Sequence, residues 1–191
     1  GGRISNDDYR RLSASGSIAW SDAPFRRVRL DVRAGHNERG FPGPYGSDPE
    51  GLFGGLDSIS RGENNHRSMA LTATTRSRGA FDHRVQLTWT EAAGTFVSPF
   101  GESEDENTRL TGRYQLDASV AGAGVSIGAE GLRERALNTF ITDDTFSPIP
   151  VRRSNVGLFA EVRPELANRV FATIGLRVER LDRTRLIGDG S

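Results

Sequence analysis

The sequence predicts an all-β protein built around one antiparallel up-and-down sheet of about eight long strands. Apolar and polar residues alternate with a period of two through about eight segments, these segments are long, and the connections between them alternate between short and long. A period of two indicates a strand whose two faces differ, and helical spacing fits none of these segments well.

The first four strands are expected before residue 92. Their apolar positions recur at every second residue, with serine, threonine, glutamine or charged residues at most positions between them. Each strand should therefore have one apolar face and one polar face. The four apolar sets, in chain order, are Leu12, Ala14, Gly16, Ile18 and Trp20; Val28, Leu30, Val32 and Ala34; Met69, Leu71 and Ala73; and Val85, Leu87 and Trp89.

The last four strands follow the same rule. Their apolar sets are Leu110, Gly112, Tyr114 and Leu116; Val125, Ile127 and Ala129; Val156, Leu158, Ala160 and Val162; and Val170, Ala172, Ile174, Leu176 and Val178. The parity predicts that one side of the sheet carries Leu30, Leu87, Ile127, Leu158 and Ile174. The other side should carry Arg29, Gln86, Glu130, Glu161 and Arg177.

The lengths of strands and connections favour a segment of a transmembrane β-barrel. The alternating segments run roughly nine to twelve residues, and about 9–11 residues cross a bilayer as a tilted strand. Residues 21–25, 77–82, 120–124 and 163–169 form short connections, whereas 37–65, 92–107 and 137–153 form long ones. All tight turns would then lie at one end of the sheet and all long loops at the other, as in outer-membrane barrels.

The sequence also predicts whether the sheet closes on itself and what surrounds it. Charged residues on the polar face suit a wide, wet lumen, and Gly128 and Gly175 would leave gaps in a narrow barrel that side chains must fill. We therefore expect an open sheet whose first and last strands do not pair, with Trp20 at a membrane interface. Two alternatives remain open: a soluble antiparallel β-sheet that binds a ligand, and a small outer-membrane barrel with an enzymatic or adhesive function.

Composition and motifs exclude several kinds of site. The chain has 25 Lys+Arg and 25 Asp+Glu, so no excess of positive charge indicates nucleic acid. It has no Cys, which excludes disulfides and thiolate metal sites. His36, His66 and His83 form no recognisable catalytic set, so we expect no enzyme and no cofactor. The acidic run of Glu102, Glu104, Asp105 and Glu106 matches no defined calcium loop, so no metal site is assigned.

Four stretches carry a resemblance to a known family. They are "NERGFPGPYGSDPEGLFGGLDSISRGENN" at 37–65, "SPFG" at 98–101, "RERALNTFIT" at 133–142, and "GLFAEVRPELANRVFATIGLRVER" at 157–180. Their order and spacing resemble the barrel region of TonB-dependent outer-membrane receptors, most closely the vitamin B12 (cobalamin) receptor-like branch. The resemblance covers nearly the whole chain. Each motif taken alone is loosely defined, and the order and spacing of the motifs carry the resemblance.

The resemblance implies a function and partners. Such receptors take up a large, scarce nutrient, cobalamin or a ferric siderophore, across the cell outer membrane. They are energised by TonB through a plug region that this sequence does not contain. Their barrels have about 22 strands, so residues 1–191 would be a partial barrel, in contact with outer-membrane lipid and unable to transport alone.

The candidate ligand-binding residues lie in the segments expected to face outward. Large aromatic side chains in wet loops can line a binding entrance, and arginines there can meet an anionic group. The ligand-entrance candidates are Arg39, Phe41, Tyr45, Phe53, Arg61, Phe96, Phe100 and Phe140.

Overall fold

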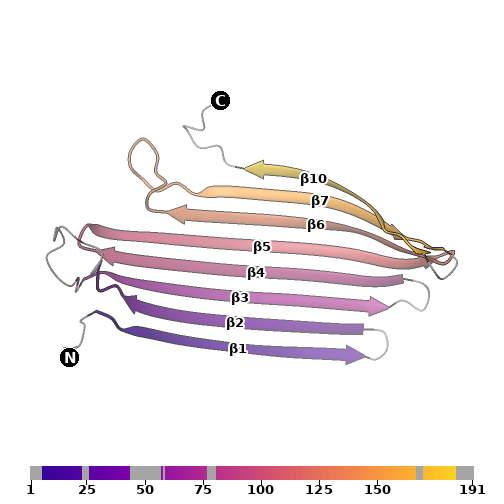
Figure 1. Cartoon of the computed structure of the whole chain (residues 1–191), viewed down its shortest axis with the longest axis horizontal. Helices are drawn as coiled ribbons and strands as arrows, with labels where there is room; N and C mark the ends of the chain where they lie inside the picture. Colours follow the sequence, from indigo (N-terminus) through magenta and orange to yellow (C-terminus); the bar gives the residue numbers. More distant parts are fainter. Residues whose placement is uncertain are drawn as a thin grey trace.

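The computed structural model describes residues 6–22, 26–43, 57, 59–76, 81–166 and 170–183. The regular structure in these residues is entirely β. Eight long strands form one curved antiparallel sheet, and two very short strands form a separate ribbon (Figure 1). The all-β fold class predicted from the alternation is confirmed.

The strands of the main sheet are 10 to 20 residues long. In chain order they are β1 (Tyr9–Asp22), β2 (Arg26–Gly40), β3 (Arg61–Arg76), β4 (Phe81–Ser98), β5 (Gly101–Val120), β6 (Ala123–Asn138), β7 (Val151–Arg163) and β10 (Ile174–Arg183). The ribbon consists of β8 (Glu165–Leu166) and β9 (Val170–Phe171), which lie in the connection between β7 and β10.

The topology is an up-and-down meander. The strand order β1-β2-β3-β4-β5-β6-β7-β10 follows the chain, and every pairing is antiparallel. Only the small β8–β9 ribbon interrupts the sequence order. Among the described residues β1 and β10 pair with one neighbour each and not with one another, so the sheet is open, as predicted.

The connections segregate by end, as predicted. Strands β1, β3, β5 and β7 all end at one end of the sheet, on the right in Figure 1, whereas β2, β4 and β6 end at the other. We call these the short-turn end and the outer end.

One predicted loop is wrong. Residues 92–107 were expected to form a long connection, but β4 and β5 stay paired as far as Ser98 and Gly101. Only Pro99 and Phe100 join them, and Gly101 adopts a φ of +132°, a conformation that favours glycine. The two strands are therefore 18 and 20 residues long, well beyond the expected nine to twelve.

The sheet has no second layer among the described residues. None of their hydrophobic side chains is buried, and Leu12 and Leu176 are about 70% exposed (71% and 70%). A soluble sandwich would bury one face of this sheet against another sheet. The described structure instead leaves one side of the sheet apolar and uncovered.

Candidate functional site

The two sides of the sheet differ in chemistry. Leu30, Leu71 and Leu87 lie directly opposite one another on β2, β3 and β4. The continuous register puts the predicted apolar residues Leu30, Leu87, Ile127, Leu158 and Ile174 on one side, and Arg29, Gln86, Glu130, Glu161 and Arg177 on the other. The predicted faces are thus confirmed. We call these sides the apolar face and the polar face.

The apolar residues of the apolar face form a band across the eight strands, which we call the apolar band, and its outer margin is slanted. On each strand the margin is the last apolar residue or glycine before a polar or charged one on the same face. From β1 to β10 these residues are Leu12, Ala34, Met69, Trp89, Leu110, Gly131, Val156 and Val178. Successive strand pairings lead from Val178 on β10 straight across the sheet to Trp20 on β1. Trp20 lies eight residues along β1 from the margin residue Leu12, so the margin is displaced by eight residues between the two edge strands.

This slant has the size expected of tilted membrane strands. The margin moves eight residues along the strands while it crosses the seven steps from β1 to β10. With a rise of about 3.3 Å per residue and about 4.8 Å between strands, the slant corresponds to a tilt of about 38°. Strands of outer-membrane barrels tilt by about 35–45°. If the strands were tilted by this amount from the membrane normal, the outer margin of the apolar band would run parallel to the membrane surface.

Aromatic residues mark the two margins of the band. Trp20 and Phe81 lie on the apolar face towards the short-turn end. Tyr114 lies further inside the band, opposite Val85, and its hydroxyl lies 2.8 Å from His83 Nδ1. Trp89 lies at the outer margin. Phe81 and Trp89 are eight residues apart on β4, about 26 Å along the strand. At the inferred tilt this covers about 21 Å of depth, close to the apolar band of about 25 Å in outer-membrane barrels.

Ion pairs avoid the apolar band. On the apolar face the described pairs are Arg61–Asp8, Arg67–Glu91, and His36 with Glu38 and Glu63, all on the outer side of the margin. The polar face carries the others: Arg29–Asp31, Arg109–Glu134, Arg153–Glu134, Arg163–Asp117, Arg163–Glu161, Arg177–Glu130 and Arg177–Glu179. These side chains are partly exposed, so the pairs contribute little stability, but they make the polar face strongly hydrophilic.

Glycines on the polar face accommodate neighbouring side chains. Gly128 lies directly opposite Phe159, and a Cβ at Gly128 would come within 2.4 Å of the Phe159 ring. The Arg113 guanidinium lies 4.6 Å from the centre of that ring. Gly128 was expected to leave a gap, but the ring of Phe159 fills it. Gly35 and His66 form a second pair of this kind, in which a Cβ would lie 2.0 Å from the imidazole.

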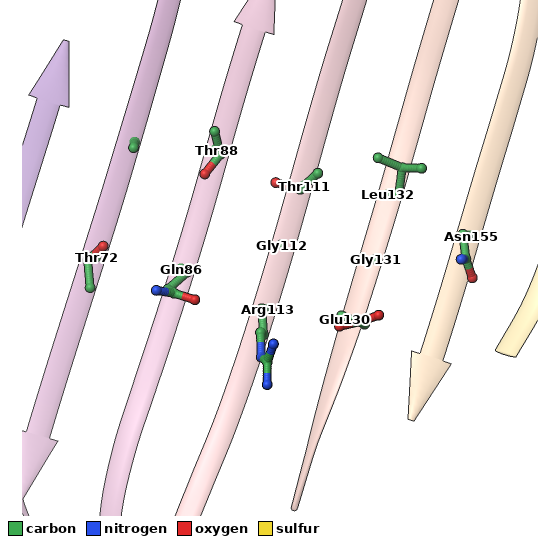
Figure 2. Close-up of a pocket in the computed structure, with 11 residues that line it drawn as sticks. Thr72, Gln86, Thr88, Thr111, Gly112, Arg113, Glu130, Gly131, Leu132 and Asn155 are labelled. Atoms are coloured by element: carbon green, nitrogen blue, oxygen red, sulfur yellow. The ribbon is translucent and has the colours of Figure 1, made fainter. Parts of the chain in front are cut away.

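A shallow hollow lies across the middle of the polar face (Figure 2). It has a volume of about 450 Å³, and its polar lining includes Gln86, Thr88, Arg113, Glu130 and Asn155 from β4 to β7. The Asn155 amide nitrogen donates to Glu179, while its buried oxygen accepts no hydrogen bond from any described residue. The hollow therefore offers an unused acceptor. Sequence reasoning missed this residue, because only the register brings it beside Glu130 and Glu179.

The outer end of the polar face brings three of the predicted entrance residues together. The rings of Phe41 and Phe96 meet edge to face with their centres 5.4 Å apart. The Arg39 guanidinium lies 5.3 Å from the centre of the Phe41 ring. The two rings also bracket Gly62, whose missing side chain leaves them room. We call Arg39, Phe41 and Phe96 the rim cluster.

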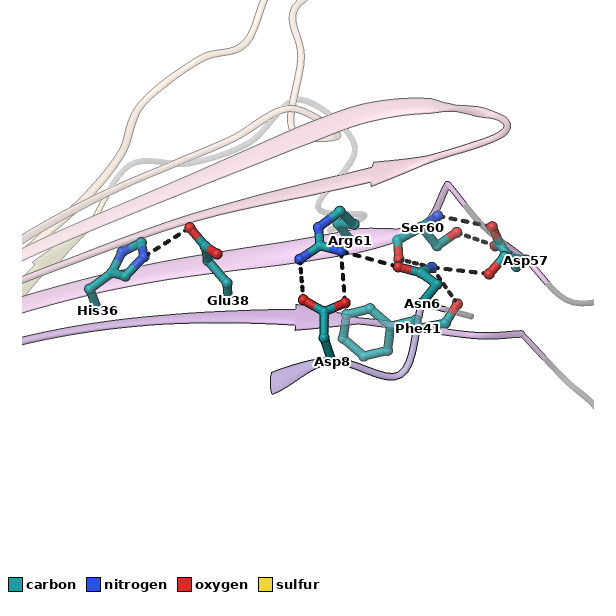
Figure 3. Close-up of polar contacts among 8 residues, drawn as sticks. All are labelled: Asn6, Asp8, His36, Glu38, Phe41, Asp57, Ser60 and Arg61. Carbon is teal, nitrogen blue, oxygen red and sulfur yellow. Dashed lines mark hydrogen bonds and ion pairs between the residues drawn. The ribbon is translucent and has the colours of Figure 1, made fainter. Parts of the chain in front are cut away.

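Backbone and polar contacts hold the rim cluster in place. The Asn6 side chain donates to the carbonyl oxygens of Ser60, Asp57 and Phe41, at 2.8, 3.0 and 3.4 Å (Figure 3). Asp57 accepts from the backbone N–H groups of Ile59 and Ser60 and from the Ser60 hydroxyl. The hydrogen bonds from Ser60 hold the pKa of Asp57 below its ordinary value. These bonds fix both ends of the 41–60 connection against the start of the chain.

The other entrance candidates lie elsewhere. Arg61 occupies the apolar-face side of β3, where it forms a two-pronged ion pair with Asp8, at 2.7 and 2.9 Å. Phe100, at the β4–β5 turn, is 92% exposed, and Phe140, in the β6–β7 connection, is 79% exposed. Tyr45 and Phe53 lie outside the described residues. The expected single group of eight is therefore reduced to a cluster of three.

The acidic run on β5 does not converge. Glu102, Glu104 and Glu106 lie on the apolar-face side of the strand and Asp105 on the other. Within the described part of the chain no group of three or more His, Asp or Glu side chains is placed to hold a metal ion. In the β6–β7 connection, Asp143 instead accepts from the backbone N–H groups of Thr145 and Ser147.

The Asp8–Arg61 pair predicts a pH effect at the outer end. The hydrogen bond from Arg61 is the main reason that the pKa of Asp8 lies below its ordinary value. Because the folded pKa is lowered, the pair contributes stability above the unfolded pKa and loses it as the pH falls through the folded value. A carboxyl-carbon NMR titration should show a depressed Asp8 midpoint that returns to the ordinary range in Arg61→Gln. The matched variant Arg67→Gln should leave it unchanged; an equal shift in both variants would contradict the assignment.

The described residues include no helix long and apolar enough to cross a membrane. A scan against protein-family models and a search of curated proteins found no match to this chain. A function is therefore inferred from the residues and their arrangement alone.

Proposed function

We propose that this chain is a wall segment of an outer-membrane β-barrel. In this proposal its apolar face contacts lipid and its polar face lines a wide, water-filled lumen. The observation that carries the proposal is the slanted apolar band. Its height, its tilt of about 38° and its aromatic margins each match the dimensions of a membrane barrel.

The unpaired edge strands and the charged polar face both support a wide barrel. The edge strands β1 and β10 do not pair among the described residues, so eight strands leave the sheet open. The polar-face ion pairs include Arg177–Glu130 and Arg153–Glu134, whose side chains retain 20–49% exposure. Burying such groups in a small, filled barrel would cost several kcal/mol per ion. A lumen that holds water avoids this cost.

We further propose that the parent barrel is a TonB-dependent transporter for a large, scarce nutrient. The motifs at 37–65, 98–101, 133–142 and 157–180 support this class by resemblance. The rim cluster supports an uptake role, because two aromatic rings and an arginine at the outer end of the polar face can contact a large ligand with anionic groups. Cobalamin and ferric siderophores are the proposed ligands, and TonB would act through parts outside this chain.

Tryptophan fluorescence tests the membrane placement directly. The chain has two tryptophans, Trp20 and Trp89, and both lie on the apolar face near opposite margins. The chain refolded into phosphatidylcholine vesicles should show quenching of both by lipids brominated near the headgroup, and weaker quenching by lipids brominated near the chain ends. Single-tryptophan variants Trp20→Phe and Trp89→Phe separate the two signals. No quenching by any brominated lipid would contradict the proposal and favour a soluble binding module.

Ligand titration tests the uptake role. In the same vesicles, equilibrium dialysis with cyanocobalamin and with a ferric siderophore should detect binding of one of them. Phe41→Ala should weaken it by roughly tenfold, which corresponds to a loss of about 1.4 kcal/mol. Phe140→Ala is the matched control, because Phe140 lies outside the rim cluster. Equal affinity in all three proteins would remove the rim cluster from the proposal.

A further inference from the structure

The charges on the polar face are unevenly distributed. From β5 to β10 arginines and acids pair across the strands, as in Arg153–Glu134 and Arg177–Glu130. On strands β1, β2 and β3 the same face has a single acid, Asp31. The arginines that share the polar face of β1 and β2 with it are Arg11, Arg27, Arg29, Arg33 and Arg39. This part of the polar face is therefore strongly positive.

A second hollow lies on the positive part of the polar face, over β2, β3 and β4. It has a volume of about 670 Å³. Its charged lining residues are Arg27, Arg29, Arg33 and Asp31, and the others are mainly serines and threonines of β3 and β4. We call it the β2 hollow. It adjoins the central hollow of Figure 2, with which it shares Thr72 and Thr88.

Each arginine of the β2 hollow has a hydroxyl-bearing residue directly opposite it on β3. The three opposite pairs are Arg27–Thr74, Arg29–Thr72 and Arg33–Ser68. The hydroxyls of these three β3 residues make no hydrogen bond with any described residue. They therefore remain available as donors beside the guanidinium groups.

Asp31 neutralises one of the three arginines. The Arg29 guanidinium donates to both carboxylate oxygens of Asp31, at 2.7 and 2.8 Å. Arg33 is also attracted to Asp31, but it forms no hydrogen bond or ion pair with any described residue, and neither does Arg27. The other acid on this face as far as β4 is Asp82, which is two strands from β2. The β2 hollow therefore holds an excess of two positive charges.

This combination of positive charge and unused donors suits an anion of a particular shape. A guanidinium binds carboxylate or phosphate oxygens through charge-assisted hydrogen bonds. Arg27 and Arg33 are six residues apart on β2, about 20 Å along the strand. Because side chains stand roughly perpendicular to a sheet, one carboxylate or phosphate group cannot reach both arginines. Asp31 lies between them and repels an anionic group there.

We propose that the β2 hollow binds a large anion with two separated carboxylate or phosphate groups. One group contacts Arg27 and Thr74. The other contacts Arg33 and Ser68. The inference rests on the proposed uptake function, which places the polar face in the lumen. It narrows the ligand of that function to a multiply charged molecule, because a neutral ligand would leave both arginines without a counter-charge. Arg39 of the rim cluster lies six residues beyond Arg33 on the same face, so a ligand that moves inward from the rim meets Arg33 next.

Dicarboxylates of different length test this site. Decanedioate has a carboxylate at each end of a long chain, butanedioate is a short dicarboxylate, and acetate has a single carboxylate. Equilibrium dialysis measures their binding to the full chain in phosphatidylcholine vesicles, with protein-free vesicles to correct for partitioning. Decanedioate should bind at least about tenfold more tightly than the other two, because its second carboxylate binds intramolecularly once the first is held. Cyanocobalamin, which has no net charge, should not displace it.

Single substitutions assign the two ends of the site. Arg27→Gln and Arg33→Gln should each lower the affinity for decanedioate to about that for acetate, because only one end can then be held. Arg153→Gln is the matched control, because it removes the same charge from the polar face at a residue that pairs with Glu134. It should keep the preference for decanedioate. Quenching by brominated phosphatidylcholine shows whether each variant still inserts.

Asp31→Asn tests the acid between the two ends. This substitution frees Arg29, which lies two residues from Arg27, about 7 Å along the strand. Butanedioate should then bind about as tightly as decanedioate does to the unsubstituted protein. If butanedioate gained no affinity, Asp31 would not be the group that keeps the two anionic ends apart.

The contrary outcomes separate the anion site from the proposed function. Quenching by brominated lipid without any preference for decanedioate would overturn the anion site and leave the membrane placement intact. A preference that survives Arg27→Gln and Arg33→Gln, or that Arg153→Gln removes equally, would also overturn the site. Displacement by cyanocobalamin would overturn the anionic class of ligand. Binding of decanedioate without quenching by any brominated lipid would support the site and overturn the proposed membrane wall.

Discussion

Val85→Arg is expected to lower the free energy of unfolding in a phospholipid bilayer by about 2–4 kcal/mol, the cost of an arginine on the lipid side of a barrel at mid-depth. Val85 lies midway between Phe81 and Trp89 on β4, with Ala73 and Tyr114 directly opposite it on the apolar face. At this depth the guanidinium has neither water nor an acidic partner on that face. Urea unfolding in phosphatidylcholine vesicles, followed by tryptophan fluorescence, measures the change.

The matched substitution is Thr88→Arg. Thr88 lies on the same strand but on the polar face, opposite Ala70 and Thr111, where a guanidinium can reach water. Its cost should stay below about 1 kcal/mol, the range of ordinary surface substitutions. If the two variants lost equal stability, or if Val85→Arg were the milder one, the apolar face would not be the lipid side.

The two faces could be predicted from the sequence because a strand has only two sides. Where one side is apolar, a register slip of one residue would turn every side chain over, so the pattern fixes the pairing strongly. This holds from Leu12 to Val178, within the apolar band. The slant of the band also follows from the sequence once the strands are aligned, since it depends only on where charged residues replace apolar ones.

The hairpin of β4 and β5 could not be predicted in the same way. Beyond Trp89 and Leu110 both faces of the strands carry polar residues, so the alternation that identifies a strand disappears. The sequence pattern therefore predicts a polar loop here, with Glu102 and Glu104 on one face of the strand and Asp105 on the other. Backbone hydrogen bonds and the Gly101 turn determine the structure there, and neither leaves a pattern of hydrophobicity.

The rim cluster depends on a register that the sequence leaves open. Arg39 and Phe41 are two residues apart, so they were bound to share a face, but Phe96 joins them only because Gly62 lies opposite it. The pairing of Gly40 with Arg61 closes a twenty-residue connection whose interior has no alternation. That pairing puts Arg61 on the opposite side from Arg39, which separates two candidates that were grouped because both lie in segments predicted to face outward.

The pairing of glycines with rings on the polar face is likewise a product of register, and it leads to a second large effect. Gly128→Ala should lower the free energy of unfolding by about 1–3 kcal/mol, as overpacking typically does. A Cβ at Gly128 would lie 2.3 Å from the Tyr114 carbonyl oxygen and 2.4 Å from the Phe159 ring. The ring can rotate away, whereas the carbonyl oxygen belongs to the neighbouring strand and can move only if β5 and β6 separate locally.

Gly175→Ala is the control for backbone entropy, because Gly175 also lies on the polar face and a Cβ there would have its nearest contact at 3.7 Å, the Ala160 carbonyl oxygen. Alanine fits this site without strain, so it should leave the stability unchanged or raise it by up to about 1 kcal/mol through the unfolded chain. If Phe159 and Tyr114 occupy the space at Gly128, urea unfolding of both variants in the same vesicles should show a loss of stability for Gly128→Ala and no loss for Gly175→Ala. Adding Phe159→Ala to Gly128→Ala should recover only the part of the loss that comes from the ring. Equal stability of Gly128→Ala and Gly175→Ala would show that the polar face is loosely packed at β6, and that the stacking of Arg113 on Phe159 does not persist in solution.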